Sequence, residues 1–465
     1  MIIEGWIKIM LGLIGVIGND ILTNPAFLLG LMSFIGLVAL KKPINKLIVG
    51  TLKPILGFIM LGAGADFIVK NLDYLGKMIE KGFNITGVVP NNEAIVSIAQ
   101  KVLGKETMFI LLAGLIINIL IARFTKFKYI FLTGHHSFFL ACMFSAVLAK
   151  IGFTGGVLVL VGGLLLGMWS AISPAIGQRY TDLVTDDDGI AMGHFGSLGY
   201  YVAAFIGEKI GNPEDSTENI KIPEKLNFLR DTTISTGITM LVFYIVAAIA
   251  AGPEYVSELS GGKNYIVFAI ISALSFAVGV TIVYNGVRMI LAELIQAFQG
   301  ISQKVIPNSI PAVDCAVFFT YAPNAVIIGF LSSFVGGVLG MLILGAMGAV
   351  LIIPGLVPHF FCGATAGIYG HATGGRKGAI VGAFVNGLFL SFLPALLLPV
   401  LGGIGFQNTT FGDIDFGVLG IIVGKVGEVY KAPGLLAIIL VLAIFIIVPS
   451  IVKKDVKVIN AKDEY

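Results

Sequence analysis

The residues best able to do chemistry in this chain are polar side chains that interrupt apolar stretches. They gather in four clusters, which are His135 and His136 in FLTGHHSFFLACMF (131–144), His194 in GIAMGHFGSLGYY (189–201), Asn92 and Glu93 in GVVPNNEAIV (87–96), and Asp314 in SIPAVDCAVFF (309–319). An ionisable group inside a membrane span is costly, and it is a functional-site hypothesis by default. These clusters are therefore the first candidates for a functional site.

The kinds of side chain in the clusters suggest which solute they could bind. Neutral donors and acceptors (His, Asn, Ser and Thr) together with two carboxylates suit a polyhydroxylated solute. Each group also has a plainer explanation on its own. A lone histidine could simply bond a neighbouring carbonyl, Asp314 could be a helix N-cap, and the PNNE stretch could be an exposed turn. The joint pattern favours binding of a solute.

Several other chemistries lack their sequence motifs. The five histidines show no HExxH spacing, and Cys142, Cys315 and Cys362 are isolated in apolar surroundings. Spacing along the chain therefore predicts no metal site and no disulfide framework. The phosphate-binding loop of ATPases and the GxSxG nucleophile elbow are also missing from the sequence. We expect neither a cofactor nor nucleic acid as a partner.

The composition is that of a membrane protein. Of 465 residues, 57% are hydrophobic and only 12% are charged, whereas soluble domains carry about 25% charged residues. The 60 glycines fit a helix bundle in which small residues let helices approach closely. The fold class predicted is an all-α polytopic membrane protein.

Stretches of about 20 apolar residues are long enough to cross a bilayer as helices. Eleven are predicted, at 24–40, 46–68, 107–123, 129–150, 153–175, 232–252, 265–296, 316–336, 338–354, 378–402 and 433–452. Shorter or interrupted apolar segments lie at 6–17, 190–207, 357–373 and 417–425. Segments 190–207 and 357–373 are expected to be re-entrant or broken helices, because such backbone is tolerated at membrane depth only where protein or water covers it.

The loops indicate orientation and a division of the chain. Lysine and arginine cluster near 41–46, 123–128, 376–377 and 453–457, and the positive-inside rule puts these regions and the C-terminus in the cytoplasm. A charged segment at 207–231 separates two weakly similar halves, about 1–206 and 232–425. If the repeat is real, it matches the inverted-repeat plan of transporters. The chain is predicted to be one membrane-embedded domain, 1–465, with helix 433–452 at its end.

A long stretch carries a family resemblance. The segment GVRMILAELIQAFQGISQKVIPNSIPAVDCAVFFTYAPNAVIIGF (286–330) resembles the permease (IIC) component of the L-ascorbate type in the bacterial phosphoenolpyruvate-dependent phosphotransferase system. GFIMLGAG (57–64), FLTGHHSFF, GHF (193–195) and LIIPGLVPHFF (351–361) extend the resemblance along most of the chain. The 207–231 segment also resembles the related galactitol-type permeases.

The resemblance implies an architecture and a set of partners. It implies a homodimer in the bacterial inner membrane, with about eleven spans per protomer in inverted repeats. A scaffold domain would hold the dimer while a core domain carries the solute in an elevator-like movement. A separate IIB protein, phosphorylated on cysteine and recharged by IIA, would phosphorylate the solute. The permease would therefore not be an enzyme on its own.

Carried over by residue, the family's substrate contacts fall on the polar clusters. One stretch matches His135, His136, Ser137, Phe138 and Phe139; a second matches His194 and Phe195; Asp314 matches a third; and a looser alignment adds Asn92 and Glu93. The ascorbate proteins carry glutamine at the positions of Phe139 and Phe195, and phenylalanine offers no polar contact there. The solute predicted is L-ascorbate or a related sugar acid, lactone or polyol.

Two other function classes stay open on sequence alone. An ion-gradient-driven secondary transporter of a small polyhydroxylated solute could use Asp66, Glu293 and Asp314 for coupling, and it would release the solute unmodified. The stretch at 286–330 argues against it. A membrane enzyme is disfavoured because no nucleophile–base pair or metal motif is present.

Overall fold

The computed structural model describes residues 25–83, 88, 90, 92–219, 232–304, 306–352, 354–355, 358–401 and 410–451. Within these ranges the chain is mostly helical, as predicted. The helices are α2 (Pro25–Ala39), α3 (Ile44–Phe83), α4 (Asn92–Phe124), α5 (Gly134–Ile151), α6 (Gly155–Thr185), α7 (Ser197–Ile210), η2 (Thr217–Asn219), α8 (Thr232–Ala251), α9 (Pro253–Leu259), α10 (Tyr265–Lys304), η4 (Cys315–Thr320), α11 (Pro323–Ala346), η5 (His359–Gly363), α13 (Ala364–Leu401) and α14 (Ile414–Ile451).

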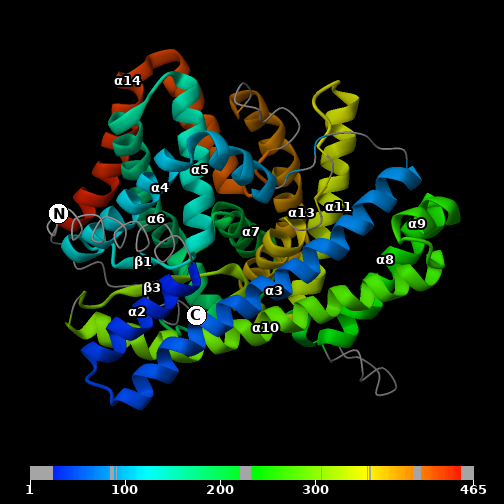
Figure 1. Ribbon diagram of the computed structural model, residues 1–465, viewed down its shortest axis with the longest axis horizontal. Helices are drawn as coiled ribbons and strands as arrows, with labels where there is room; N and C mark the ends of the chain where they lie inside the picture. The colour runs from blue at the N-terminus through cyan, green and yellow to red at the C-terminus, as the bar shows by residue number, and fades with distance from the viewer. Residues whose placement is uncertain are drawn as a thin grey trace, which may run out of the picture.

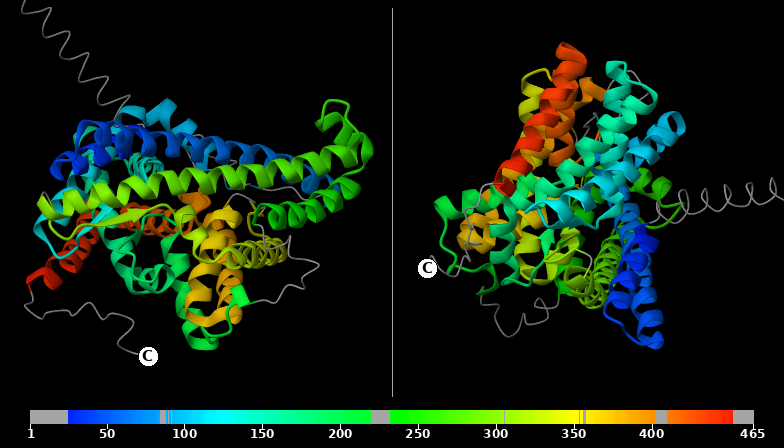
Figure 2. Two further views of the ribbon diagram at one scale, coloured as in Figure 1. Left: turned by 90° about the horizontal axis from the view of Figure 1, so that it is seen from below. Right: turned by 90° about the vertical axis from the view of Figure 1, so that its left-hand side faces the viewer.

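Two helices of 40 residues each, α3 and α10, form one side of the molecule. They lie side by side and run in opposite directions, with α2 and α8 packed against both (Figures 1 and 2). On the other side, α4, α5, α6 and α14 pack together, and α7, α11 and α13 pack on one another beside this group. The interior of the molecule is thus enclosed by helices from both halves of the chain.

Three short strands lie in that interior and depart from the all-α expectation. They are β1 (Tyr129–Phe131), β2 (Ala191–Met192) and β3 (Ile310–Val313), and they form a parallel sheet in the order β1-β3-β2. Tyr129 pairs with Ile310 and Phe131 with Ala312, while Met192 pairs with Val313. Parallel pairing brings the three carboxyl ends to one edge of the sheet.

The two faces of this sheet belong to two different apolar cores. Successive side chains of a strand point to opposite faces. Accordingly, Phe131 and Ala312 pack into a core built mainly by α4, α5, α6 and α14, whereas Ile130 and Val313 pack into a core built by α7, α8, α10, α11 and α13. The sheet therefore lies at the boundary between the two packed bodies.

Several predicted spans differ from the helices observed. Span 129–150 is split, because residues 129–131 form β1 and α5 begins only at Gly134. Spans 316–336 and 338–354 are wrong as two units: residues 315–320 are a 3₁₀ helix, and α11 runs unbroken from Pro323 to Ala346. The glycines at 336 and 337 do not end this helix, because they face closely packed backbone and His359.

Other predicted segments merge into longer, bent helices. Segments 357–373 and 378–402 join as η5 and α13, with a break at Gly374 and Gly375, where Gly375 has a φ of 58°. Segments 417–425 and 433–452 join as α14, which bends at Lys431. Segment 190–207 is interrupted as expected, since β2 is followed by a turn and then by α7. Segment 6–17 and residues 220–231 of the predicted linker lie outside the described residues.

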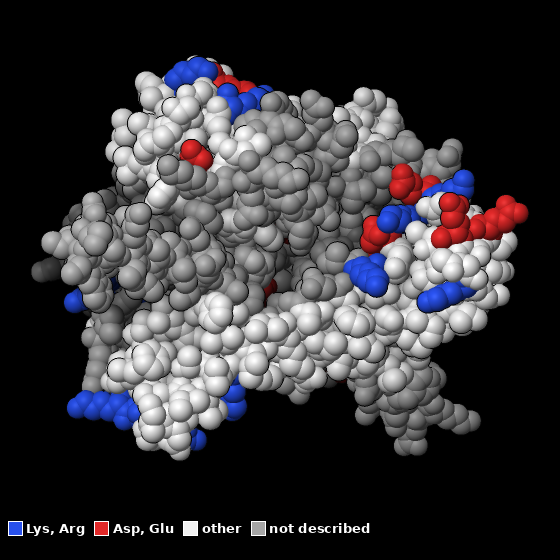
Figure 3. All heavy atoms as spheres, viewed as in Figure 1, with Lys and Arg blue, Asp and Glu red and all other residues white. Residues whose placement is uncertain are grey.

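Some of the observed helices are suited to a bilayer. Among the described residues, five helical segments are long and apolar enough to span it, namely α5, α6, α11, η5 with α13, and α14. The number is six if the bent pair α8–α9 counts as one span. On α14 the side chains of Leu436, Val441 and Ile444 are more than half exposed. On the face of the molecule drawn in Figure 3, the described charged residues lie mainly near the margins. These features indicate a multi-pass membrane protein.

Candidate functional site

The polar clusters of the sequence meet at the carboxyl edge of the sheet. His135 and His136 follow β1, His194 follows β2, and Asp314 follows β3 directly. The carboxyl ends of parallel strands are a common place for ligands, because loops and helix N-termini from distant parts of the chain converge there. Three clusters that are far apart in the sequence therefore share one site.

His135 and Asp314 form the more open part of this site. Their Nε2 and Oδ2 atoms lie 3.4 Å apart, and their side chains are 28% and 17% exposed. Asp314 is also the residue before η4, but its side chain makes no capping hydrogen bond there. The carboxylate is therefore directed to the histidine rather than to the helix end.

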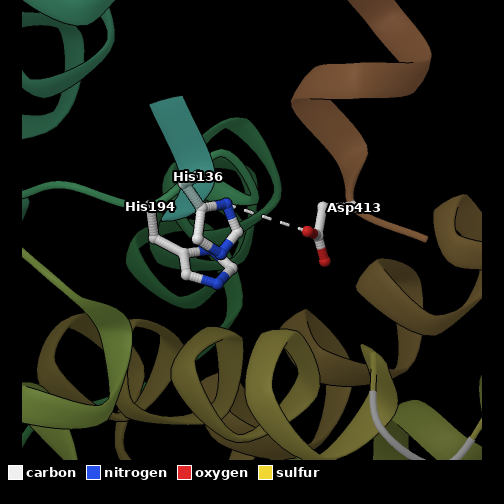
Figure 4. Close-up of side chains that lie close together, drawn as sticks. All are labelled: His136, His194 and Asp413. Carbon is white, nitrogen blue, oxygen red and sulfur yellow. Dashed lines mark ion pairs between the residues drawn. The ribbon is translucent and has the colours of Figure 1, made fainter. Parts of the chain in front are cut away.

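His136 and His194 form the buried part. Their ring centroids are 3.7 Å apart, and both side chains are almost fully buried (Figure 4). Nδ1 of His136 accepts a long hydrogen bond from the backbone N–H of Phe195, at 3.4 Å. Nδ1 of His194 accepts the N–H of Gly196 at 3.1 Å and lies 2.8 Å from the hydroxyl of Tyr200. Both rings are thus held in fixed orientations.

Asp413, just before α14, completes the buried part. Its Oδ2 lies 3.9 Å from Nδ1 of His136 and accepts a 2.9 Å hydrogen bond from the amide of Asn92. Its Oδ1 accepts the thiol of Cys362 at 3.0 Å. The oxygen of the Asn92 amide in turn accepts the N–H of Gly412 at 2.9 Å. The start of α4 is thereby joined to the strand-end site.

A third carboxylate, that of Asp415, fixes the turn that carries His194. Its oxygens accept hydrogen bonds from the indole of Trp169, the hydroxyl of Ser197 and the N–H of Leu198, at 3.2, 2.9 and 3.0 Å. Its own N–H donates to the carbonyl of Phe195 at 2.9 Å. A buried charge is tolerated when it is bonded in this way. Asp415 therefore joins α6, α14 and the start of α7.

Aromatic rings form the apolar wall of the site. Phe416 lies parallel to the ring of His136 at a centroid distance of 5.8 Å, and Phe139 meets His135 edge-on at the same distance. Phe195 is fully buried and stacks on Phe131 at 4.4 Å. Phe138 contacts Phe139 and packs against the core of α4, α5, α6 and α14. Phe195 and Phe138 thus serve mainly in packing.

Two hydroxyls near the histidines are buried and unused within the described part of the chain. Neither Thr133 Oγ1 nor Ser137 Oγ has a hydrogen-bond partner there. An unpaired buried hydroxyl costs free energy, and a polar ligand could satisfy it. Thr133 immediately precedes α5, and Ser137 lies in the first turn of that helix.

The structure brings together most of the residues that the sequence singled out. His135, His136, Phe139, His194 and Asp314 lie at one edge of the sheet, and Asn92 reaches it through Asp413. Glu93 lies in the first turn of α4, and its side chain is not among those described, as is also true of Asp66 and Glu293. Sequence reasoning missed Asp413, Asp415, Tyr200 and Cys362. The motif FGDIDFG (411–417), two carboxylates between glycines before an apolar run, could have indicated the first two.

Comparison with known proteins identifies a family and a relative. A family model described as "PTS system sugar-specific permease component" matches residues 20–415. The "Ascorbate-specific PTS system EIIC component" of Mycoplasma pneumoniae is 29% identical over 417 residues, which cover 78% of this chain and 63% of that protein. This chain thus spans somewhat less than two thirds of that relative.

Proposed function

This chain belongs to the sugar-specific permease components of the phosphotransferase system, and from that premise we propose that it carries L-ascorbate or a related sugar acid or polyol across the membrane. A separate IIB protein, phosphorylated on cysteine and recharged by IIA, phosphorylates the solute during uptake. The permease supplies binding and passage, and the IIB cysteine supplies the phosphoryl group. Accumulation follows because the charged product is trapped inside the cell.

The observation that carries this proposal is the polar strand-end site between two apolar cores. A bilayer protein gains nothing from placing two carboxylates and three histidines together unless they serve a ligand. In addition, the buried hydroxyls of Thr133 and Ser137 have no partner among the described residues. Polyhydroxylated solutes offer many donors and acceptors that can pair with such groups.

The residues have distinct roles in this proposal. Asp314 accepts hydrogen bonds from solute hydroxyls, and His135 beside it bonds a neighbouring oxygen. His136 and His194 act as neutral imidazoles in the buried part of the site. Asn92 and Asp413 close this part on the side of α4 and α14.

The two phenylalanines limit which solute fits. Phe195 is buried against Phe131 and offers the solute no polar group. Phe139 is half-buried beside His135 and can stack on the apolar face of a sugar ring. A lactone, a different sugar acid or a polyol is therefore compatible with the site, as well as ascorbate.

The finer architecture belongs to the same proposal. We expect about eleven spans, inverted repeats over 1–206 and 232–425, the linker 207–231 and a terminal helix 433–452. The two apolar cores on either side of the sheet support a division into scaffold and core bodies that move as in an elevator. A homodimer in the bacterial inner membrane, with a cytoplasmic C-terminus, completes the scheme.

Uptake of labelled L-ascorbate tests the proposed function. Cells that lack their own ascorbate permease would be given this protein with matching IIA and IIB, and recovered label would be separated into free and phosphorylated forms. Phosphorylated ascorbate is the expected product. Asp314→Asn should reduce its formation, and His371→Gln, a change near Thr217 of η2, is the matched control.

Other outcomes would contradict parts of this function. Free ascorbate inside the cells would favour an ion-gradient-driven transporter instead. No accumulation, with the protein present in the membrane, would exclude ascorbate and move the search to other sugar acids and polyols. Phosphorylated label in cells without IIB would show that the phosphoryl donor has been assigned wrongly.

A further inference from the structure

The buried part of the site contains a set of donor atoms of the kinds that bind metal ions. One donor atom from each of His136, His194 and Asp413 lies within 4.8 Å of the other two (Figure 4). All three side chains are at least nine-tenths buried. No two of these residues are close in sequence, so no metal-binding motif could reveal the set.

This donor set has the chemistry of a transition-metal site. Two imidazoles and one carboxylate are the ligands of many zinc and iron centres that keep an open coordination position. A neutral imidazole has one nitrogen with a lone pair, and in this structure Nδ1 of each ring accepts a backbone N–H. Metal binding through these imidazoles therefore displaces those contacts, and the carboxylate supplies the negative charge that a divalent cation needs. Hard cations such as Mg²⁺ and Ca²⁺ prefer sites made wholly of oxygen.

The residues behind the three donors hold them in place. The hydroxyl of Tyr200 lies against the ring of His194, and the amide of Asn92 donates to Asp413. The thiol of Cys362 bonds the other oxygen of Asp413. Metal sites depend on such outer partners to orient their ligands. The constellation is therefore a built site rather than a chance meeting of side chains.

We propose that His136, His194 and Asp413 bind a divalent transition metal ion such as Zn²⁺, and that the bound ion prevents solute binding. The ion reaches the site past His135 and Asp314, which are partly exposed at its open side. Exclusion of solute follows because the ion occupies the same imidazoles that are proposed to contact the solute. This second part rests on the proposed function, whereas metal binding does not.

Binding of Co²⁺ to the purified full-length protein tests the metal site directly. The protein would carry an affinity tag without histidine, and Co²⁺ would be followed by its visible absorption. We expect one Co²⁺ per chain, displaced by Zn²⁺. Asp413→Asn and His194→Gln should weaken binding by roughly tenfold or more, while His371→Gln should bind as the wild type does.

Two results would overturn the metal site. One is the lack of saturable Co²⁺ absorption in the wild type, and the other is equal affinity in Asp413→Asn. A matching size-exclusion profile and melting temperature show that the variants are folded. His136→Gln serves as a further test if either of the two variants fails this check.

The exclusion of solute has its own test. Zn²⁺ should inhibit uptake in cells that make the wild-type protein, and a chelator should restore it. Uptake that is unchanged by Zn²⁺, in a protein that binds Co²⁺, would overturn the exclusion. If the cells show no uptake at all but the purified protein binds Co²⁺, the proposed function fails and the metal site stands.

Discussion

Two regions of the molecule bury histidines, and they use them differently. At the strand ends, His136 and His194 are surrounded by a carboxylate, a tyrosine and backbone groups from several elements. In the packing of α11 against η5, His359 is equally buried, and its Nδ1 bonds the hydroxyl of Ser333 at 2.8 Å. No ion pair to a carboxylate is found for His359 in the described part of the chain.

The contrast shows what separates a structural histidine from a candidate ligand-binding one. A single neutral partner satisfies His359, and Gly337 lies so close that an added Cβ would be 2.4 Å from its ring. At the strand ends, by contrast, polar groups from several elements meet, and two hydroxyls have no partner among the described residues. Substitutions in the two regions should therefore affect different measurements.

The largest effect is expected for Asp415→Ala. This change leaves the Trp169 indole, the Ser197 hydroxyl and the Leu198 N–H without their acceptor, at a cost of about 3 kcal/mol or more. A lower melting temperature and a loss of uptake would be measured together. Ser197→Ala, which removes one donor and leaves the carboxylate, should have a clearly smaller effect. Equal melting temperatures for Asp415→Ala and the wild type would contradict the role of this carboxylate.

Gly337→Ala should be the next most severe change, and only for stability. The new methyl group meets the ring of His359, and overpacking of this kind costs about 1–3 kcal/mol. The melting temperature should fall while the KM for uptake stays unchanged. The matched control is Gly76→Ala in α3, where an added Cβ meets nothing within 4 Å. A changed KM in Gly337→Ala would mean that the region around His359 takes part in solute binding.

Asp314→Asn should have the opposite effect to Gly337→Ala. It should lower the affinity for the solute and hardly change the stability of the protein. Loss of a charged acceptor for solute hydroxyls costs about 1.5 kcal/mol, which raises KM by roughly tenfold. The exposed pair of Asp73 and Lys77 on α3 offers a control, because Asp73→Asn should leave KM unchanged. An unaltered KM in Asp314→Asn would mean that Asp314 does not bind the solute and serves only at the start of η4.

The smallest effect on uptake is expected at the aromatic wall. Phe139→Gln together with Phe195→Gln should shift uptake toward ascorbate by a few-fold relative to a polyol, because glutamine offers polar contacts to hydroxyls. Competition between the labelled solutes measures the shift. Phe195→Gln alone should also lower the melting temperature, since it buries an amide in the stack with Phe131. An unchanged preference in the double variant would mean that neither position selects the solute.

The polar residues of the site could be predicted from the sequence better than the sheet that positions them. His135, His194 and Asp314 stood out because each interrupts apolar sequence, and a bilayer makes such interruptions costly. No comparable sequence pattern marks the sheet that brings these residues together. Its strands have two to four residues and are covered on both faces, so no alternation of polar and apolar residues marks them. Pro311 even argues against a central strand, yet β3 lies in the middle.

The residues missed were those whose importance depends on distant partners. Asp413 comes just before α14 and is joined to α4 through Asn92. Cys362 looked like an isolated apolar cysteine, and only the fold places its thiol on Asp413. Nothing local to these positions indicates such contacts. The predicted boundary at 336–338 failed for a related reason, because the glycines there are sites of close helix packing within one continuous helix.

The order of the strands has a consequence for how the protein is made. The central strand, β3, is synthesised after both of its neighbours, so β1 and β2 leave the ribosome without the strand that each must pair with. His135 and His194 are in the nascent chain long before Asp314 exists, and Asp413 emerges later still. Pairing between such distant segments is intrinsically slow. The site should thus be among the last parts of the molecule to assemble, and a chain that ends before α14 would contain all of its histidines without forming it.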